Sequence, residues 1–277
     1  MVRTWVLVLA LVLFTGCATT TPLMEPPRVN APPASAFPST ATEPASAFTL
    51  VAHRGGALVY PESSKEAFDA VGKTAFPIET DLRQLRDGTL VPLHDAKVDR
   101  TMTGVAGLPS ELSLEQWKAA RIQGPSGGAD GTPTTWEAVL DQYGGRRVLV
   151  PELKDPGIDP NAFAASILRR GIQDKVIVQT FSYPVAQALA TSGLHVLYLL
   201  REGEEPDPGA VRSSGIDHVG PHKSISAEYL RKLKASGFTV WPYTVNDEAT
   251  ASRLRADGAD GVFTDTPWEL SKQLRLG

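Results

Sequence analysis

Cysteine is almost absent from this chain of 277 residues, in which Cys17 is the only one. A disulfide framework is therefore excluded, so packing and any bound cation must stabilise the folded part. No basic run occurs and the formal net charge is -4, which argues against nucleic acid as a partner. No internal repeat is visible.

The first 17 residues predict an export signal. Arg3 precedes an apolar run over residues 5–14, and a Thr-Gly pair then leads to Cys17. A basic start, a short apolar run and small residues before a cleavage point are typical of a secretory signal rather than a membrane span. The position of Cys17 resembles the end of a bacterial lipoprotein signal, which implies lipid attachment to its sulfur. The alternatives are an ordinary signal peptide with an incidental cysteine and an uncleaved N-terminal anchor.

Residues 18–48 are rich in Pro, Ala, Ser and Thr, with seven prolines and no apolar periodicity. Such a segment cannot bury enough surface to offset its chain entropy, so it predicts a disordered tether. Signal and tether together predict an exported bacterial lipoprotein, anchored to a membrane on its periplasmic or cell-surface side. Residues 49–277 are long enough for one domain with a sizeable core.

In this domain, short apolar runs alternate with longer amphipathic stretches of helical period. Strands that alternate with helices form βαβ units, and eight of them in a domain of this length predict a (β/α)₈ TIM barrel. The predicted strands are Thr49–His53, Phe76–Leu82, Arg147–Leu153, Lys175–Thr180, His195–Leu199, Asp217–Val219, Thr239–Thr244 and Gly261–Thr264. The predicted helices include Ser63–Gly72, Asn161–Arg170, Tyr183–Ser192, Ala227–Ser236 and Asp247–Asp257, and residues 96–135 are a predicted insertion with a short helix at Leu114–Ala120.

A hairpin is predicted after the second strand. Asp87-Gly88 between extended apolar residues is a strong signal for a tight two-residue turn. With these two residues at its centre, Asp81 lies directly opposite His94, and Glu79 shares their face. The strand with His94 is then a ninth strand, which runs antiparallel to the second over the mouth of the barrel.

Polar residues gather at the predicted carboxyl ends of the strands, where barrel enzymes keep their active sites. This coincidence predicts an enzyme with its site at that end of the barrel. The residues are His53, Arg54, Glu79, Asp81, Glu152, Lys154, Thr244, Asn246, Thr264 and Asp265.

Three of these residues are candidate metal ligands. Glu79, Asp81 and Glu152 offer only oxygen donors, which select one Ca²⁺ or Mg²⁺ ion over zinc. Three converging carboxylates repel one another unless a cation lies among them. The alternative is a network of salt bridges with Arg54 and Lys154 at the barrel mouth.

The remaining charged groups indicate chemistry at a phosphate. Arg54 suits bidentate contact with phosphate oxygens, and Lys154 supplies a point charge. His53 and His94 are the candidate acid–base pair, because an imidazole pKa near 6.5 suits proton transfer around neutral pH. The residues alone leave open which histidine is the acid, and we take His53 as the acid and His94 as the base as a working hypothesis.

The domain resembles the glycerophosphodiester phosphodiesterases over residues 49–277. This resemblance implies a TIM-barrel phosphodiesterase that uses a divalent cation to hydrolyse glycerophosphodiesters to glycerol 3-phosphate and an alcohol. The shared motifs, in order, are His53-Arg54-Gly55, Pro61-Glu62, Glu79-x-Asp81, Asp87-Gly88, His94-Asp95, Glu152-x-Lys154, Trp241 with Thr244-Val245-Asn246, and Gly261-Val262-Phe263-Thr264-Asp265.

Position by position, the resemblance implies the same site residues: the histidine pair, the three carboxylate ligands, and Arg54 and Lys154 at the phosphate. It adds Glu62, Trp241 and Asn246 as residues of the pocket wall or of the surroundings of the metal. Two departures stand out. Ser63 replaces the asparagine of the family's Pro-Glu-Asn motif, and an extra residue after Trp241 would displace its ring from the pocket wall.

Two other functions stay open. One is phospholipase D-like or phospholipid lyase activity of the same superfamily on intact membrane lipids, which the lipid anchor would permit. The other is a binding lipoprotein without catalysis, although none of the expected carboxylates or histidines is missing. No sequence feature predicts a protein partner.

Overall fold

The computed structural model of the protein describes residues 48–276. The predicted signal peptide over residues 1–17, Cys17 itself, and the predicted tether except for Phe48 lie outside this range. Within the described range, no helix has both the length and the apolar character that crossing a membrane requires.

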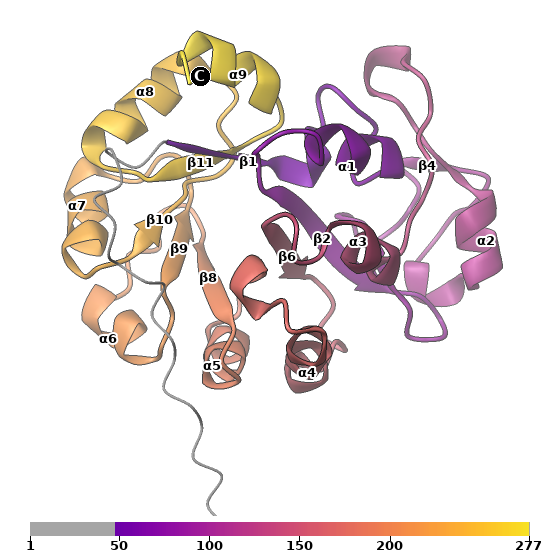
Figure 1. The fold of residues 1–277 in the computed structure, drawn as a ribbon, viewed down its shortest axis with the longest axis horizontal. Coiled ribbons are helices and arrows are strands. Elements are labelled where there is room, and N and C mark those ends of the chain that lie inside the picture. Colours follow the sequence, from indigo (N-terminus) through magenta and orange to yellow (C-terminus); the bar gives the residue numbers. More distant parts are fainter. Residues whose placement is uncertain (1–47, 277) are drawn as a thin grey trace, which may run out of the picture. The chain divides into compact units, whose positions relative to one another are not determined.

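The predicted barrel is confirmed. Eight strands form one sheet in the order β10-β9-β8-β7-β6-β2-β1-β11, and every neighbouring pair in this order is parallel. Figure 1 shows these strands surrounded by helices. The strands are β1 (Thr49–Ala52), β2 (Ile78–Gln84), β6 (Leu149–Leu153), β7 (Ile177–Thr180), β8 (His195–Leu200), β9 (His218–Pro221), β10 (Thr239–Val240) and β11 (Gly261–Thr264).

Backbone hydrogen bonds link the two end strands without a regular ladder. The amide of Asp260 donates to the carbonyl of Val240 at 3.0 Å, and that of Phe263 to the carbonyl of Pro242 at 2.9 Å. The predicted strand Thr239–Thr244 is shortened to β10, because Pro242 has no N–H to donate to the ladder. The barrel is therefore nearly closed.

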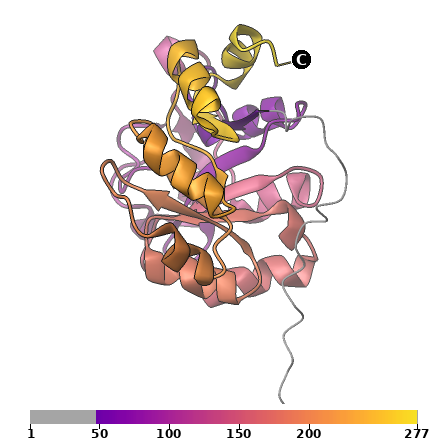
Figure 2. The same ribbon diagram turned by 90° about the vertical axis from the view of Figure 1, so that its left-hand side faces the viewer.

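The helices lie outside the strands, and Figure 2 shows the side that α6 to α8 cover. Ser226 caps the start of helix α7, because its hydroxyl accepts the amide of Tyr229, and the helix buries Leu230 and Leu233. Each such leucine contributes roughly 1.5–3 kcal/mol by leaving water. The outer helices are α1 (Lys65–Val71), α3 (Trp136–Tyr143), α4 (Pro160–Arg170), α5 (Tyr183–Thr191), α6 (Pro208–Ser213), α7 (Ala227–Ala235), α8 (Glu248–Asp257) and α9 (Pro267–Gln273), with a 3₁₀ turn η4 (Gln173–Lys175) before β7.

The interior of the barrel is a packed apolar layer below its mouth. Trp241 belongs to this layer and is buried, so its ring fills the barrel instead of reaching the mouth. Successive side chains on a strand point to opposite faces of the sheet. Val150 therefore points into the barrel, whereas its neighbour Leu149 packs against the helices. The inward layer comprises Val51, Val150, Ile177, Leu197, Leu199, Trp241 and Phe263.

The predicted insertion after the second strand has a small core of its own. The helix predicted at Leu114–Ala120 is confirmed, whereas the two-stranded sheet beside it is an addition to the predicted elements. Figure 1 shows α2 and β4 at the side of the barrel. The hairpin strand β3 (Leu90–Pro92) precedes the insertion, whose elements are β4 (Met102–Thr103), η2 (Pro109–Glu111), α2 (Leu114–Ala119), β5 (Arg121–Ile122) and η3 (Pro125–Gly127).

The register of the hairpin differs from the prediction by one residue. Strand β3 is antiparallel to β2 as expected, but Leu82 faces Pro92, and the carbonyl of Asp81 accepts the amide of Leu93 at 2.9 Å. The predicted opposition of Asp81 and His94 is therefore wrong. The cause is the turn, which has three residues between Leu85 and Thr89 and holds Gly88 at φ 85.

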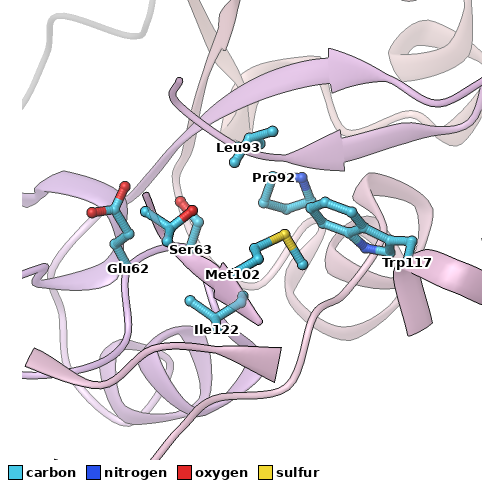
Figure 3. A pocket seen from close by; sticks show the side chains of 8 residues that line it. Glu62, Ser63, Pro92, Leu93, Met102, Trp117 and Ile122 are labelled. Atoms are coloured by element: carbon cyan, nitrogen blue, oxygen red, sulfur yellow. The ribbon is translucent and has the colours of Figure 1, made fainter. Parts of the chain in front are cut away.

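A small cavity of about 10 Å³ lies where the insertion meets the barrel. Figure 3 shows Met102 and Trp117 of the insertion on one side of it and Ser63 close to Glu62 on the other. Ser63 adopts φ 57, a conformation in which asparagine is enriched. Among the described residues, the buried hydroxyl of Thr101, which also lines this cavity, has no hydrogen-bond partner.

Candidate active site

A tight turn after β1 places the first two site residues. In η1 (His53–Gly55), Arg54 has φ 50 and Gly55 has φ 77. A Cβ atom on Gly55 would lie 2.7 Å from that of Ala67, so only glycine fits there. The strained turn directs the amide of Arg54 to Oε2 of Glu79, at 2.6 Å. His53 and Arg54 thereby face the end of β2.

All seven residues predicted as catalytic, phosphate-binding or metal-binding line one pocket of about 210 Å³. It lies at the carboxyl ends of the strands, where the alternation of strands and helices predicts it. His94 reaches it although the predicted register is wrong, because β3 ends at Pro92 and the chain is then free to bend. The lining residues are His53, Arg54, Glu79, Asp81, His94, Glu152, Lys154, Gln179, Phe181, Leu199, Tyr243, Thr244 and Phe263.

The three carboxylates come from two adjacent strands. Glu79 and Asp81 belong to β2, and Asp81 faces Glu152 of β6 in the ladder. Burial, and then the charge of Asp81, raise the pKa of Glu79 to about 7 and that of Glu152 to about 8. Burial acts on Asp81 as well, but the charges of Lys154 and Arg54 outweigh it and lower the pKa of Asp81. The pocket thus holds more carboxylates than its cations can neutralise.

Two cations lie against these carboxylates. The Nζ atom of Lys154 is 2.9 Å from Oε2 of Glu152 and 3.3 Å from Oδ1 of Asp81. The Nε atom of Arg54 is 3.5 Å from Oδ2 of Asp81, and among the described residues neither atom of this pair has a hydrogen-bond partner. The network of salt bridges that was the alternative to a metal site is therefore present.

The donor chemistry at the same place fits a hard cation. Glu79, Asp81 and Glu152 are buried, all offer oxygen, and Oδ2 of Asp81 lacks a hydrogen bond within the described part of the chain. Over residues 48–276, however, no three His, Cys, Asp or Glu side chains are grouped closely enough to hold a metal as they stand. The ammonium group of Lys154 pairs with both Asp81 and Glu152 in this arrangement.

His53 is oriented from behind by a chain of polar residues. Its Nδ1 atom lies 2.7 Å from Oδ1 of Asp265, whose other oxygen accepts the amide group of Asn246 at 2.7 Å. A carboxylate only accepts, so Nδ1 carries the proton and Nε2 is the atom left for chemistry. Burial lowers the pKa of His53, but the charge of Glu79 and the hydrogen bond to Asp265 outweigh burial and raise it.

His94 is also held through Nδ1 by a carboxylate, but its pKa is shifted in the opposite direction from that of His53. Its Nδ1 atom lies 2.8 Å from Oδ1 of Asp95, the next residue in the chain. Burial, together with the charge of Arg54, lowers the pKa of His94 against the opposing charge of Asp81. His53 is therefore the more basic of the two histidines, and His94 is the weaker base.

The three further residues implied by the resemblance have different positions. Asn246 supports His53 through Asp265, and Glu62 accepts a hydrogen bond from Nη1 of Arg54 at 3.2 Å. Trp241 does not line the pocket, as the extra residue after it suggested. Tyr243 lines the wall instead, and its hydroxyl donates to the carbonyl of Leu200 at 2.8 Å.

Several contacts at the site were not assigned from the sequence. Asp95 and Asp265 belong to motifs shared with the family and directly follow His94 and Thr264 in the sequence. Their positions in these motifs could therefore have indicated that they lie at the site. Gln179 donates from Nε2 to Oε1 of Glu79 at 2.7 Å. It lies in a buried strand and in none of the shared motifs, so the sequence did not indicate this contact. Phe181 contributes an apolar wall next to Lys154, whose Nζ atom is 5.8 Å from the ring centre.

Comparison with known proteins identifies the site. The profile of the glycerophosphoryl diester phosphodiesterase family matches residues 53–269, which include every residue of the pocket. The chain belongs to this family. The protein is therefore an enzyme of the glycerophosphodiester phosphodiesterase type, and its barrel is the fold of that family.

Relatives of this phosphodiesterase support the assignment. A glycerophosphodiester phosphodiesterase from Caldanaerobacter subterraneus is 30% identical over 82% of this chain and 98% of its own length. A phosphodiesterase from Oleispira antarctica, solved in complex with the product sn-glycerol-3-phosphate, is 25% identical with a TM-score of 0.71 and covers 82% of this chain and 96% of its own. A structure from Silicibacter pomeroyi shares the fold, with a TM-score of 0.73 at 21% identity, and covers 83% of this chain and 94% of its own.

Proposed function

We propose that this enzyme hydrolyses glycerophosphodiesters to glycerol 3-phosphate and an alcohol, with His53 and His94 as its acid–base pair. One observation carries the proposal: two histidines, each held through Nδ1 by a carboxylate, enter a single pocket together with Arg54 and Lys154. Proton donors and acceptors then flank a site for a phosphodiester. The relative that was solved with sn-glycerol-3-phosphate supports the same product.

Arg54 and Lys154 bind the phosphate in this proposal. Arg54 offers a planar fork of N–H groups, and Lys154 offers a compact charge that it now shares with Asp81 and Glu152. Both groups stabilise the negative charge that grows on the phosphoryl oxygens as the bond to the alcohol breaks. Tyr243 and Phe181 line the rest of the pocket. The volume of about 210 Å³ suits a small-molecule substrate.

The histidines exchange protons with the reacting oxygens. His94, whose pKa is lowered mainly by burial, accepts at Nε2 the proton of the nucleophile, which is water or the neighbouring glycerol hydroxyl of the substrate. If the hydroxyl attacks, the first product is a cyclic phosphate, and one water must open this ring in a second step to give glycerol 3-phosphate, its proton going to one histidine while the other protonates the ring oxygen that leaves. His53, whose pKa is raised against the effect of burial by Glu79 and Asp265, gives its proton to the leaving alcohol oxygen. Asp95 and Asp265 keep each ring in the orientation that these transfers require.

Glu79, Asp81 and Glu152 would hold one divalent cation, Ca²⁺ or Mg²⁺, as membership of this metal-dependent family implies. When bound, the cation supplies positive charge to a phosphoryl oxygen. Burial, and then the charge of Asp81, raise the pKa of Glu79 to about 7 and that of Glu152 to about 8, and a cation bound between these carboxylates would lower both values.

We also propose that the chain is an exported bacterial lipoprotein, anchored through a lipid on Cys17 and facing the periplasm or the cell surface. The apolar run, the small residues before Cys17 and the proline-rich segment after it support this proposal. In this arrangement the tether holds the barrel at a membrane surface while the substrate remains water-soluble.

Product analysis on glycerophosphocholine, with cation and after chelation, tests the proposed reaction. We expect glycerol 3-phosphate and choline with the cation present and no turnover after chelation. A cyclic phosphate as the final product would favour the lyase, and cleavage of intact phosphatidylcholine would favour the phospholipase D-like activity. Binding without turnover in the presence of cation would favour the non-catalytic lipoprotein.

A further inference from the structure

Arg100 lies in the insertion, six residues after His94, and binds two carboxylates at once. Its Nε and Nη2 atoms donate to Asp95 at 2.5 and 3.1 Å, and its Nη1 and Nη2 atoms donate to Glu62 at 2.9 and 2.8 Å. Two N–H groups thus meet each carboxylate, which is the fork geometry that only a guanidinium provides.

Each of these carboxylates holds a different residue of the pocket. Asp95 contacts Nδ1 of His94 at 2.8 Å, and Glu62 accepts from Nη1 of Arg54 at 3.2 Å. His94 follows β3 and Arg54 follows β1, so the two reach the pocket from separate segments. Arg100 connects both supports in a single side chain.

We propose that Arg100 is a positioning residue of the phosphodiester reaction. It holds Asp95 in the orientation in which the imidazole of His94 faces the pocket, and it keeps Glu62 from pairing fully with Arg54. A Glu62 without Arg100 would have only Arg54 as its cationic partner and would draw that guanidinium away from a phosphate. The inference rests on the proposed roles of His94 and Arg54 in the reaction.

A purely structural role explains Arg100 less well. Its side chain is 52% exposed, so solvent screens its ion pairs and limits their contribution to folding stability. Positioning within a site, in contrast, has large kinetic effects, since small displacements of a catalytic group cost up to about a hundredfold in rate. Activity and stability should therefore respond differently to the loss of Arg100.

The first test compares Arg100→Ala with a matched control, Arg170→Ala. Arg170 also pairs with two carboxylates, Glu137 and Asp141, but on α3 and away from the pocket. With glycerophosphocholine and saturating cation, Arg100→Ala should lower kcat on the order of 10–100-fold through His94 and raise KM several-fold through Arg54. Its melting temperature should stay close to that of Arg170→Ala, which should keep wild-type kinetics.

Two rescue measurements separate positioning from loss of charge. Arg100→Lys should recover only part of kcat, because an ammonium group cannot hold two carboxylates with paired N–H groups. Added guanidinium chloride at millimolar concentration should raise the kcat of Arg100→Ala and leave that of His94→Ala unchanged. In a double-mutant cycle, Asp95→Asn should add little to Arg100→Ala, because both act on His94.

Wild-type kcat and KM in Arg100→Ala, next to an active wild-type enzyme, would overturn this inference and leave the proposed function intact. A loss of activity that parallels a large fall in melting temperature would overturn it as well, in favour of a structural role. A wild-type enzyme without turnover on any glycerophosphodiester would instead overturn the proposed function, and the inference with it.

Discussion

Raising the pH should destabilise the metal-free domain, because the carboxyl group of Glu152 holds a proton in the folded state that it loses on unfolding. Burial, followed by the charge of Asp81, raises the pKa of Glu152 to about 8 from a usual value of 4.5. This raised pKa contributes stability that is complete below pH 4.5 and lost as the pH rises towards 8. A range from pH 5.5 to 7.5 lies inside that window.

The expected size of the effect follows from the same linkage. A proton held only by the folded state changes the free energy of unfolding by about 1.4 kcal/mol per pH unit. Two pH units, reduced by partial titration near pH 7.5, give a loss of about 2 kcal/mol. For a domain of this size the melting temperature should fall by roughly 4–8 °C. Glu79, with a pKa of about 7, acts in the same direction.

Thermal melts after chelation, at pH 5.5 and 7.5, measure this difference in the wild type and in Glu152→Gln. The variant keeps the shape of the side chain and cannot titrate, so its melting temperature should change less with pH. Burial raises the pKa of Asp265, but the hydrogen bond to His53 outweighs burial and lowers it. Asp265 therefore loses its stabilising contribution only at a more acidic pH, outside the range from pH 5.5 to 7.5. Equal pH dependence in both proteins would show that Glu152 is ionised in the folded state.

Addition of the cation completes the experiment. At a hundredfold excess over its dissociation constant, Ca²⁺ or Mg²⁺ should stabilise the wild type by about 2.7 kcal/mol at pH 7.5. The shift should be smaller at pH 5.5, where protons on Glu79 and Glu152 compete with the ion. No shift at either pH would contradict the proposed metal ligands.

Three further predictions concern single residues. His53→Ala and His94→Ala should each lower kcat on the order of 10²–10⁴-fold without unfolding the barrel, and a p-nitrophenol leaving group should rescue only His53→Ala; rescue of His94→Ala would reverse the two roles. Cys17→Ser should move the protein from the membrane fraction to the soluble one, or leave it unprocessed, with turnover unchanged; a cleaved variant that stays in the membrane would contradict the lipid anchor. Ser63→Asn should raise the melting temperature by a few degrees, because asparagine adopts the positive φ of this position more readily than serine; a lower melting temperature would show that the small cavity beside Ser63 does not accept the larger side chain.

The sequence by itself determined the barrel and the composition of its mouth. Alternating short apolar runs and amphipathic stretches bury their apolar faces as a parallel sheet covered by helices, and eight such strands in a domain of this length favour the closed barrel. Parallel strands end at one edge, so residues as distant as Arg54 and Lys154 had to converge there. The local sequence pattern was sufficient to predict these elements, because the spacing of apolar residues in each segment indicates a strand or a helix.

Only the tertiary structure decided how the side chains of the mouth meet. The hairpin register depends on the backbone of three turn residues, which a two-residue Asp-Gly signal misjudges by one position. Asp265 reaches His53 across 212 positions of sequence, and Arg100 meets Glu62 only after the insertion has packed beside the barrel. Such pairs leave no periodic trace, because their geometry results from the packing of whole elements and not from the spacing of residues within one.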